Sequence, residues 1–161
     1  MNILTEKLKK VVSARRAQGT PDNVLMNAIK EELQYPVLDF IYNSKEYSHL
    51  IMYGGTLLRI AYGLPRMSED LDFQTSEKFN LKKFTEKLAS HFKTTYDVAV
   101  EIKIKTERLT DTNFAYIKFP GLLEEIGLKG YGIQTKLHLR FDINQFSQAL
   151  DFSTEQISVT K

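Results

Sequence analysis

Three aspartates lie in segments where polar and apolar residues alternate along the chain. Asp70 and Asp72 flank Leu71, and Asp142 lies between two apolar residues. Alternate side chains of an extended chain share one face, so Asp70 and Asp72 point to one side and Leu71 to the other. Neighbouring carboxylates repel each other unless a cation lies between them, and oxygen ligands of this kind suit Mg²⁺ or Mn²⁺. The pattern predicts a divalent-cation site formed by Asp70, Asp72 and Asp142.

A second candidate segment precedes the first two aspartates. Gly54 and Gly55 end a short apolar run and are followed by Thr56. Because glycine has no Cβ, a phosphate-bearing ligand can approach the backbone closely at these positions. A helix beginning at Thr56 would direct free N–H groups toward the same place, and the Thr56 hydroxyl could add a hydrogen bond. Arg66 and Ser68 lie between this segment and the aspartates and are further candidates for contact with phosphate.

Each feature also has a simpler explanation when it is taken alone. Asp142 could be an exposed charge on the solvated face of a sheet, which is a common place for a strand aspartate. An isolated Asp-x-Asp is often a solvated turn, and Gly-Gly-Thr is often a turn followed by a helix cap. Arg66 could be a surface residue, and Ser68 could cap the turn into the strand. The order and spacing of all these features together favour a site.

Other polar residues are expected to have structural roles. The three histidines are far apart in the sequence and lack the spacing of a zinc site. They are His49, His91 and His138. Four lysines of the segment that begins at residue 80 most simply form a solvent face, although a polyanion such as tRNA could use them. They are Lys82, Lys83, Lys87 and Lys93. Lys136 and Arg140 share the polar side of a strand with Asp142, where pairing with that carboxylate and contact with phosphate are equally expected.

The elements that would position these residues follow from the periodicity of the apolar residues. The first forty residues have helical spacing with a break at Gly19, and Pro36 is expected to end or kink the second helix. Strands are predicted at 49–53, 71–75, 98–105, 114–119 and 135–144, and helices at 56–62 and 80–92. Helices followed by a mixed sheet with a helix laid against it predict the α+β fold class.

Length and composition narrow the class of protein. A chain of 161 residues predicts a single domain, with a helical N-terminal part over residues 1–45 and a sheet core over residues 46–146. The 22 Lys and Arg against 20 Asp and Glu give a net charge of +2, which is weak support for general nucleic-acid binding. The absence of Cys excludes disulfides and thiolate chemistry and fits a cytoplasmic protein. No apolar run approaches the roughly 20 residues of a membrane span, and no signal peptide is expected.

The run GGTLLRIAYGLPRMSEDLDF resembles the signature of the AbiEii/AbiGii toxin family, within the nucleotidyltransferases that resemble DNA polymerase beta. The superfamily pattern is a strand, Gly-Gly or Gly-Ser, a short helix, an acidic-x-acidic pair, and a third acidic residue on a later strand. Gly54 and Gly55 match the glycine position, Asp70 and Asp72 match the acidic pair, and Asp142 matches the third acidic position. The form Arg-x-Ser-x-Asp-x-Asp-Phe narrows the resemblance to the toxin family.

This resemblance implies a polymerase-beta-like fold and the transfer of NMP from an NTP to an acceptor hydroxyl of tRNA or protein. It implies that three residues are catalytic and bind Mg²⁺, or Mn²⁺: Asp70, Asp72 and Asp142. It implies that five residues bind the nucleotide: Gly54, Gly55, Thr56, Arg66 and Ser68. A toxin of this kind would act in a toxin–antitoxin or abortive-infection system that defends against phage, with an antitoxin protein as partner.

Members of the family are usually close to twice this length, so the resemblance also implies that their helical C-terminal half is absent from the 161 residues. Two alternatives therefore stay open. The chain could be a truncated, non-catalytic module that binds an NTP or a partner. The same carboxylates could instead support metal-dependent phosphohydrolysis, in which water replaces the acceptor.

Overall fold

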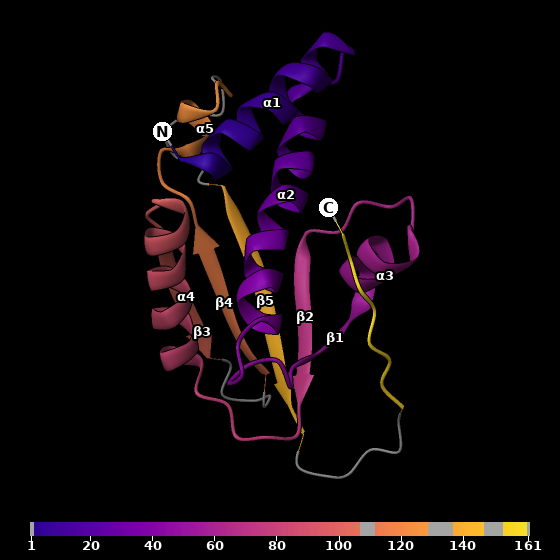
Figure 1. The fold of residues 1–161 in the computed structure, drawn as a ribbon, viewed down its shortest axis with the longest axis vertical. Helices are drawn as coiled ribbons and strands as arrows, with labels where there is room; N and C mark the ends of the chain where they lie inside the picture. Colours follow the sequence, from indigo (N-terminus) through magenta and orange to yellow (C-terminus); the bar gives the residue numbers. More distant parts are fainter. Residues whose placement is uncertain (1, 107–111, 129–136, 147–152, 161) are drawn as a thin grey trace.

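The computed structural model describes residues 2–106, 112–128, 137–146 and 153–160. The helices in this part of the chain are α1 (Ile3–Ala17), α2 (Asp22–Tyr42), α3 (Gly54–Tyr62), α4 (Leu81–Tyr96) and α5 (Leu122–Glu125). The strands are β1 (Ile51–Tyr53), β2 (Asp70–Thr75), β3 (Glu101–Thr106), β4 (Thr112–Lys118) and β5 (His138–Gln145). Helices α2 and α4 lie over one face of the sheet, and α3 lies beside β1 and β2 (Figure 1).

The described strands form one five-stranded mixed sheet in the order β1-β2-β5-β4-β3. Strands β2 and β5 are parallel, and the other neighbouring strands are antiparallel. A parallel pair needs a long connection, and the chain between β2 and β5 supplies it with α4, β3 and β4. The predicted α+β class, with N-terminal helices before a mixed sheet, is confirmed.

Helix ends are marked by the residues that local physics favours. The Asn2 side chain accepts a hydrogen bond from the Thr5 N–H at 2.7 Å, and the Asn80 side chain accepts one from the Lys83 N–H at 3.0 Å. These caps satisfy N–H groups that have no partner within α1 and α4. Helix α3 ends at Gly63, whose φ of 70° is accessible to glycine without strain.

Helix α2 continues through Pro36 to Tyr42. Of the two outcomes expected at Pro36, an end or a kink, a helix end is therefore not observed. A proline in a helix removes one hydrogen bond and costs about 3 kcal/mol. Pro36 is buried, and its neighbours Leu33 and Val37 are fully buried against the core. Because burying each such side chain contributes about 1.5–3 kcal/mol, packing of the helix face offsets the lost bond.

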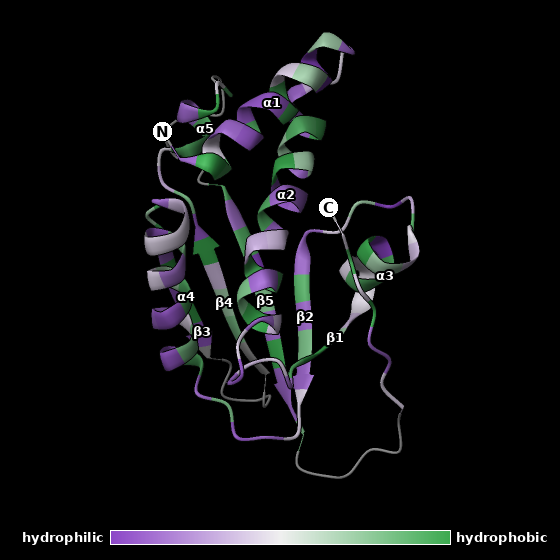
Figure 2. Ribbon diagram, in the orientation of Figure 1, coloured by the Kyte–Doolittle hydropathy of each residue, from purple (hydrophilic) through white to green (hydrophobic). Residues whose placement is uncertain are grey.

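The apolar core lies between the sheet and helices α2 and α4. Leu71, Phe73 and Phe141 point into it and are fully buried. The rings of Phe84, on α4, and Phe141, on β5, are 5.2 Å apart. Hydrophobic and hydrophilic residues alternate along β2 (Figure 2), so the other face of that strand carries its polar side chains.

Several element bounds differ from the predicted ones. Helix α3 begins at Gly54, two residues before the predicted start, and the short helix α5 was not predicted. The first two residues of the predicted strand 135–144, which include Lys136, lie outside the described residues. None of the helices in the described part combines the length and the apolarity that crossing a bilayer requires.

Candidate active site

The strand register brings the three aspartates onto one face of the sheet. Asp72 and Asp142 are direct neighbours on the parallel strands β2 and β5, and Asp70 is the neighbour of Arg140. Tyr53, at the end of β1, is the neighbour of Asp72 on its other side. Residues that are paired across strands share a face, so all five side chains lie on the face opposite the core.

Gly54 lies directly against Asp72. Its φ is +81°, and a Cβ at this position would lie 2.6 Å from Asp72 Oδ2. Both observations require glycine, because side chains disfavour this backbone conformation and no Cβ fits against the carboxylate. The absence of a side chain therefore brings the first turn of α3 into contact with the aspartate.

Gly55 lies against the other two candidate phosphate ligands. A Cβ at this position would lie 2.9 Å from Ser68 Oγ and 3.4 Å from a guanidinium nitrogen of Arg66. Ser68 is partly exposed and Arg66 is exposed. The structure therefore gathers the two glycines, Arg66, Ser68 and Asp72 around the start of α3.

Thr56 forms a hydrogen bond within the protein that the sequence did not indicate. The residue is fully buried, and its hydroxyl donates a hydrogen bond to the backbone carbonyl of Asp70. This bond fastens α3 to the first residue of β2. The hydroxyl that we predicted to contact phosphate is thus engaged within the protein in this structure.

The electrostatic surroundings of Asp72 disfavour its charged form. Burial raises the pKa of Asp72, and the nearby carboxylates of Asp142 and Asp70 raise it further. Arg140 acts in the opposite direction and lowers the pKa. The site therefore holds more negative charge around Asp72 than one arginine offsets.

Arg140 neutralises Asp142 through a bidentate ion pair. Its Nε donates to Asp142 Oδ1 at 3.1 Å, and a terminal guanidinium nitrogen lies 3.0 Å from Oδ2. The guanidinium also lies over the Phe114 ring, 4.9 Å from the ring centroid. The bond to Asp142 raises the pKa of Arg140. Of the two roles expected for Arg140, pairing with the carboxylate is the one present in this structure.

The carboxylates fit a divalent cation by chemistry. Their hard oxygen atoms are the ligands that Mg²⁺ prefers. Burial is the main cause of the raised pKa of Asp72, and a cation would offset the repulsion from Asp142 and Asp70 that adds to it. Within the described residues, no three His, Asp or Glu side chains are grouped closely enough to hold a metal ion. Arg140 supplies the positive charge at Asp142 instead.

Sequence reasoning missed a contact between Tyr53 and Asn144 beside the aspartates. The Asn144 side chain donates a hydrogen bond to the Tyr53 hydroxyl. Burial raises the pKa of Tyr53, and Asp72 and Asp142 raise it further. The sequence contained part of the signal for this contact. Asn144 is two residues after Asp142 on an alternating strand, and Tyr53 directly precedes the glycine pair.

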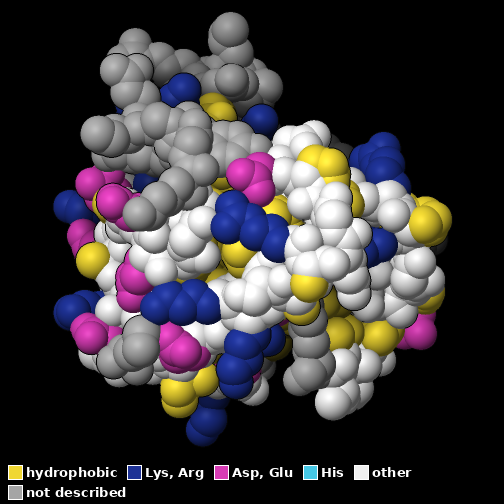
Figure 3. All heavy atoms as spheres, turned by 90° about the horizontal axis from the view of Figure 1, so that it is seen from above, with side chains coloured by type: hydrophobic (Ala, Val, Ile, Leu, Met, Phe, Trp, Pro, Cys, Tyr) yellow, Lys and Arg dark blue, Asp and Glu magenta, His cyan; other side chains and the backbone are white. Residues whose placement is uncertain are grey.

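The lysines and histidines outside the site make structural contacts. Lys83 lies 2.7 Å from Glu46, and Lys87 pairs with the same carboxylate. His91 packs against Phe40, with ring centroids 5.2 Å apart, and burial lowers the pKa of His91. Basic and acidic side chains are interspersed over the end of the molecule seen in Figure 3.

The chain is similar in sequence to one protein family and in fold to a solved structure. The profile of the family described as "Nucleotidyl transferase AbiEii toxin, Type IV TA system" matches residues 37–160. The fold is similar to the crystal structure of JHP933 from Helicobacter pylori, with a TM-score of 0.53 and 19% identity. The match covers 81% of this chain and 49% of JHP933, so the chain spans about half of that protein.

A structure described as a candidate nucleotidyltransferase from H. pylori has a TM-score of 0.46 and 20% identity. That match covers 71% of this chain and 43% of the other. No curated protein matches the chain.

Proposed function

The chain belongs to the AbiEii nucleotidyl transferase toxin family, and on that premise we propose that it transfers NMP from an NTP to an acceptor hydroxyl. The acceptor oxygen would form a bond to the α-phosphorus, the bond to the β-phosphate would break, and pyrophosphate would leave. The observation that carries the proposal is the contact of Gly54 with Asp72, whose neighbour on β5 is Asp142. This contact joins a backbone turn that suits phosphate to carboxylates that suit a divalent cation.

The residues around the start of α3 would hold the nucleotide. The backbone at Gly54 and Gly55 would admit the phosphates, and the N–H groups of the first turn of α3 would donate to their oxygen atoms. Arg66 would add a charged hydrogen bond from one side, and Ser68 a hydroxyl from the same loop. Thr56 would support the site by fastening α3 to β2.

The aspartates would act at the phosphates of the nucleotide, where the reaction takes place. Asp72 and Asp142, with Asp70 beside them, would hold Mg²⁺ or Mn²⁺, which when bound neutralises charge on phosphate oxygens. Asp142 would also be placed to accept the proton of the acceptor hydroxyl. For either role Arg140 must release Asp142, and the phosphates are a natural new partner for its guanidinium.

We propose RNA, with tRNA as the expected class, as the source of the acceptor hydroxyl. Lys103, Tyr116 and Arg140 are neighbours across β3, β4 and β5, on the same face as the aspartates. Lys105 is exposed and its Nζ lies 5.6 Å from the centroid of the Tyr116 ring. Basic side chains interleaved with an aromatic ring suit a nucleic-acid strand, because they offer both charge and a surface for stacking.

The biological role follows from the family. We propose that the chain is the toxin of a toxin–antitoxin system that defends against phage, with an antitoxin protein as its partner. Its predicted location, the cytoplasm, stays a prediction. A transferase that modifies RNA would arrest growth by removing that RNA from use.

A second function is favoured by the ion pair at Asp142. Because Arg140 occupies both oxygen atoms of this carboxylate, the 161 residues would bind an NTP or a partner without turnover if the pair does not open. The chain spans 49% of JHP933, so residues beyond this length could be needed for catalysis.

A labelling assay distinguishes these functions. The protein is incubated with each α-labelled NTP, Mg²⁺ or Mn²⁺, and separate RNA and protein fractions. We expect label in RNA with the wild type and with Asp39→Asn, an exposed aspartate on α2, but not with Asp72→Asn. Label in protein would contradict the RNA acceptor. Equal transfer by Asp72→Asn would contradict the mechanism, and conversion of the NTP to labelled NDP or NMP without transfer would indicate phosphohydrolysis.

A further inference from the structure

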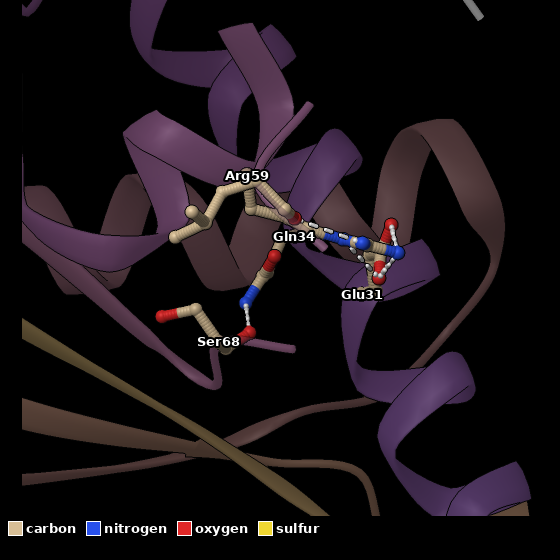
Figure 4. Close-up of polar contacts among 5 residues, drawn as sticks. Glu31, Gln34, Arg59 and Ser68 are labelled. Carbon is tan, nitrogen blue, oxygen red and sulfur yellow. Dashed lines mark hydrogen bonds and ion pairs between the residues drawn. The ribbon is translucent and has the colours of Figure 1, made fainter. Parts of the chain in front are cut away.

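Helix α2 contacts the loop that joins α3 to β2, residues 63–69, at the two positions that end the loop after Arg66. The Gln34 side chain donates a hydrogen bond from Nε2 to the Ser68 carbonyl at 2.9 Å. One turn earlier, Lys30 forms an ion pair with Glu69, the next residue of the loop. Figure 4 shows Gln34 directed toward the Ser68 backbone from α2.

A second set of contacts holds the beginning of the same loop. Arg59, in the last turn of α3, pairs with both oxygen atoms of Glu31 on α2, at 3.2–3.4 Å. Another guanidinium nitrogen of Arg59 donates to the Leu64 carbonyl at 3.0 Å. The loop is thus held at its beginning through Arg59 and at its end by α2 directly.

The burial of Gln34 argues for a role of this amide beyond packing. The side chain is fully buried on the apolar side of α2, and its Oε1 has no hydrogen-bond partner among the residues that the structure describes. Leaving a buried polar atom unpaired destabilises the fold, so an apolar residue would stabilise the helix face better. What the amide provides in return is the bond to Ser68, which no apolar residue can form.

We propose that Lys30, Glu31 and Gln34, together called the loop clamp, position Arg66 and Ser68 for contact with the phosphates of the nucleotide. The inference rests on the proposed function, since it assumes that phosphate binds at Gly55. It goes beyond the family match, because that match begins at residue 37 and the loop clamp precedes it.

The loop clamp would act by ordering the loop before the ligand arrives. Ordering a flexible segment during binding weakens affinity, and a segment that is already ordered avoids that cost. Gln34 and Lys30 touch the loop but not the glycines, so they are positioning residues. Breaking one contact should weaken phosphate affinity by roughly three- to tenfold, the range that a lost hydrogen bond gives.

The test uses the full chain with two readouts. Hydrogen exchange of the backbone amides of residues 63–69 reports the order of the loop, and equilibrium binding of magnesium tripolyphosphate reports the affinity for phosphate. The variants are Gln34→Leu and Lys30→Met, and Lys30→Arg should restore the ion pair. The matched control is Thr5→Val, which alters another fully buried polar residue on α1.

We expect Gln34→Leu and Lys30→Met to raise exchange in residues 63–69 but not in β5, and to weaken tripolyphosphate binding. Thr5→Val and Lys30→Arg should behave as the wild type in both readouts. Unchanged exchange in residues 63–69 would overturn the inference, and so would faster exchange with unchanged affinity. Failure of the wild type itself to bind tripolyphosphate would contradict the proposed function, and the exchange readout would still decide whether the loop clamp orders the loop.

Discussion

The two faces of the β2–β5 pair are built on opposite physical principles. On the core face, Leu71, Phe73 and Phe141 are fully buried among other apolar side chains. On the open face of the same strands, Asp72 and Asp142 are neighbours in a partly buried place. The first face stabilises the fold by removing apolar surface from water, whereas the second gathers like charges that repel one another.

The pKa of Glu46, a carboxylate outside the candidate site, differs from that of Asp72. Glu46 accepts hydrogen bonds from Lys83 and Lys87, and these bonds lower its pKa to about 2. The pKa of Asp72 is raised, first by burial and then by its acidic neighbours. The chain can therefore pair a carboxylate with lysines, and none of the lysines in the described part of the chain pairs with Asp72. An electrostatic cost confined to one place is typical of a functional site.

The largest effect on stability is expected on the core face. Phe141→Ala should lower the free energy of unfolding by about 3–5 kcal/mol, because it removes a fully buried ring and leaves a cavity. Gln74→Ala, on the open face of β2, should change it by less than about 0.5 kcal/mol. Urea unfolding of the two variants measures both values. Comparable losses would contradict the assignment of the two faces.

The second-largest effect on stability is expected at Gly54, which contacts Asp72. Gly54→Ala should lower the free energy of unfolding by about 2–4 kcal/mol, since it adds backbone strain and a clash with the carboxylate. Gly19→Ala is the matched control, because its φ is +76° but a Cβ there would meet no atom within 4 Å. It should cost only the strain, about 1–2 kcal/mol. Equal losses would show that contact with Asp72 is unimportant.

The two aspartates should differ in their effect on stability. Asp72→Asn should stabilise the protein at neutral pH, because it removes a charge that the fold disfavours. Since the folded pKa of Asp72 is raised, the wild type loses stability as pH rises from the unfolded toward the folded pKa. The gain of the variant should therefore be absent at acid pH and complete above the folded pKa, which urea unfolding at several pH values can measure.

Asp142→Asn should instead destabilise the protein by about 1 kcal/mol, because it breaks the ion pair with Arg140. The Arg140 side chain is 38% exposed, so solvent limits the loss. The same unfolding experiment provides the measurement. A gain of stability in both variants would mean that Arg140 does not distinguish the two carboxylates.

The smallest effect is expected at Glu46, which is exposed. The lowered pKa of Glu46 means that its pairing stabilises the fold above the unfolded pKa, and that this contribution is lost as pH falls from about 4.5 to about 2. Glu46→Gln should therefore change the thermal midpoint at pH 7 less than Phe141→Ala, Gly54→Ala or Asp142→Asn does, and high salt should remove the difference. A difference that persists in high salt would contradict simple surface pairing.

Much of the fold could be predicted from the sequence. Alternation of apolar residues identified both faces of β2 and β5, and Gly63 marked the end of α3. The sequence left an end or a kink open at Pro36, and the helix continues there because burial of the helix face outweighs the local penalty. Local pattern alone carries no information on how much apolar surface a distant strand will cover.

The candidate site could be predicted in its residues but not in its contacts. Gly54, Asp72 and Asp142 were identified by motif and spacing, and the register brings them together. The contact of Gln34 with Ser68 joins residues 34 positions apart, and no periodicity predicts such a pair. The buried hydroxyl of Thr56 was missed for the same reason, since its partner is set by the packing of α3 on β2.

The most direct test of the account is a measurement of Mn²⁺ binding by electron paramagnetic resonance, in which bound ion is lost from the free signal. The account predicts that the wild type binds Mn²⁺, that Asp72→Asn and Asp142→Asn lose this binding, and that Asp39→Asn keeps it. The open face of β2 and β5 would then be a cation site. Binding that is equal in all four proteins, or absent from the wild type, would contradict the proposal that these carboxylates bind a divalent cation.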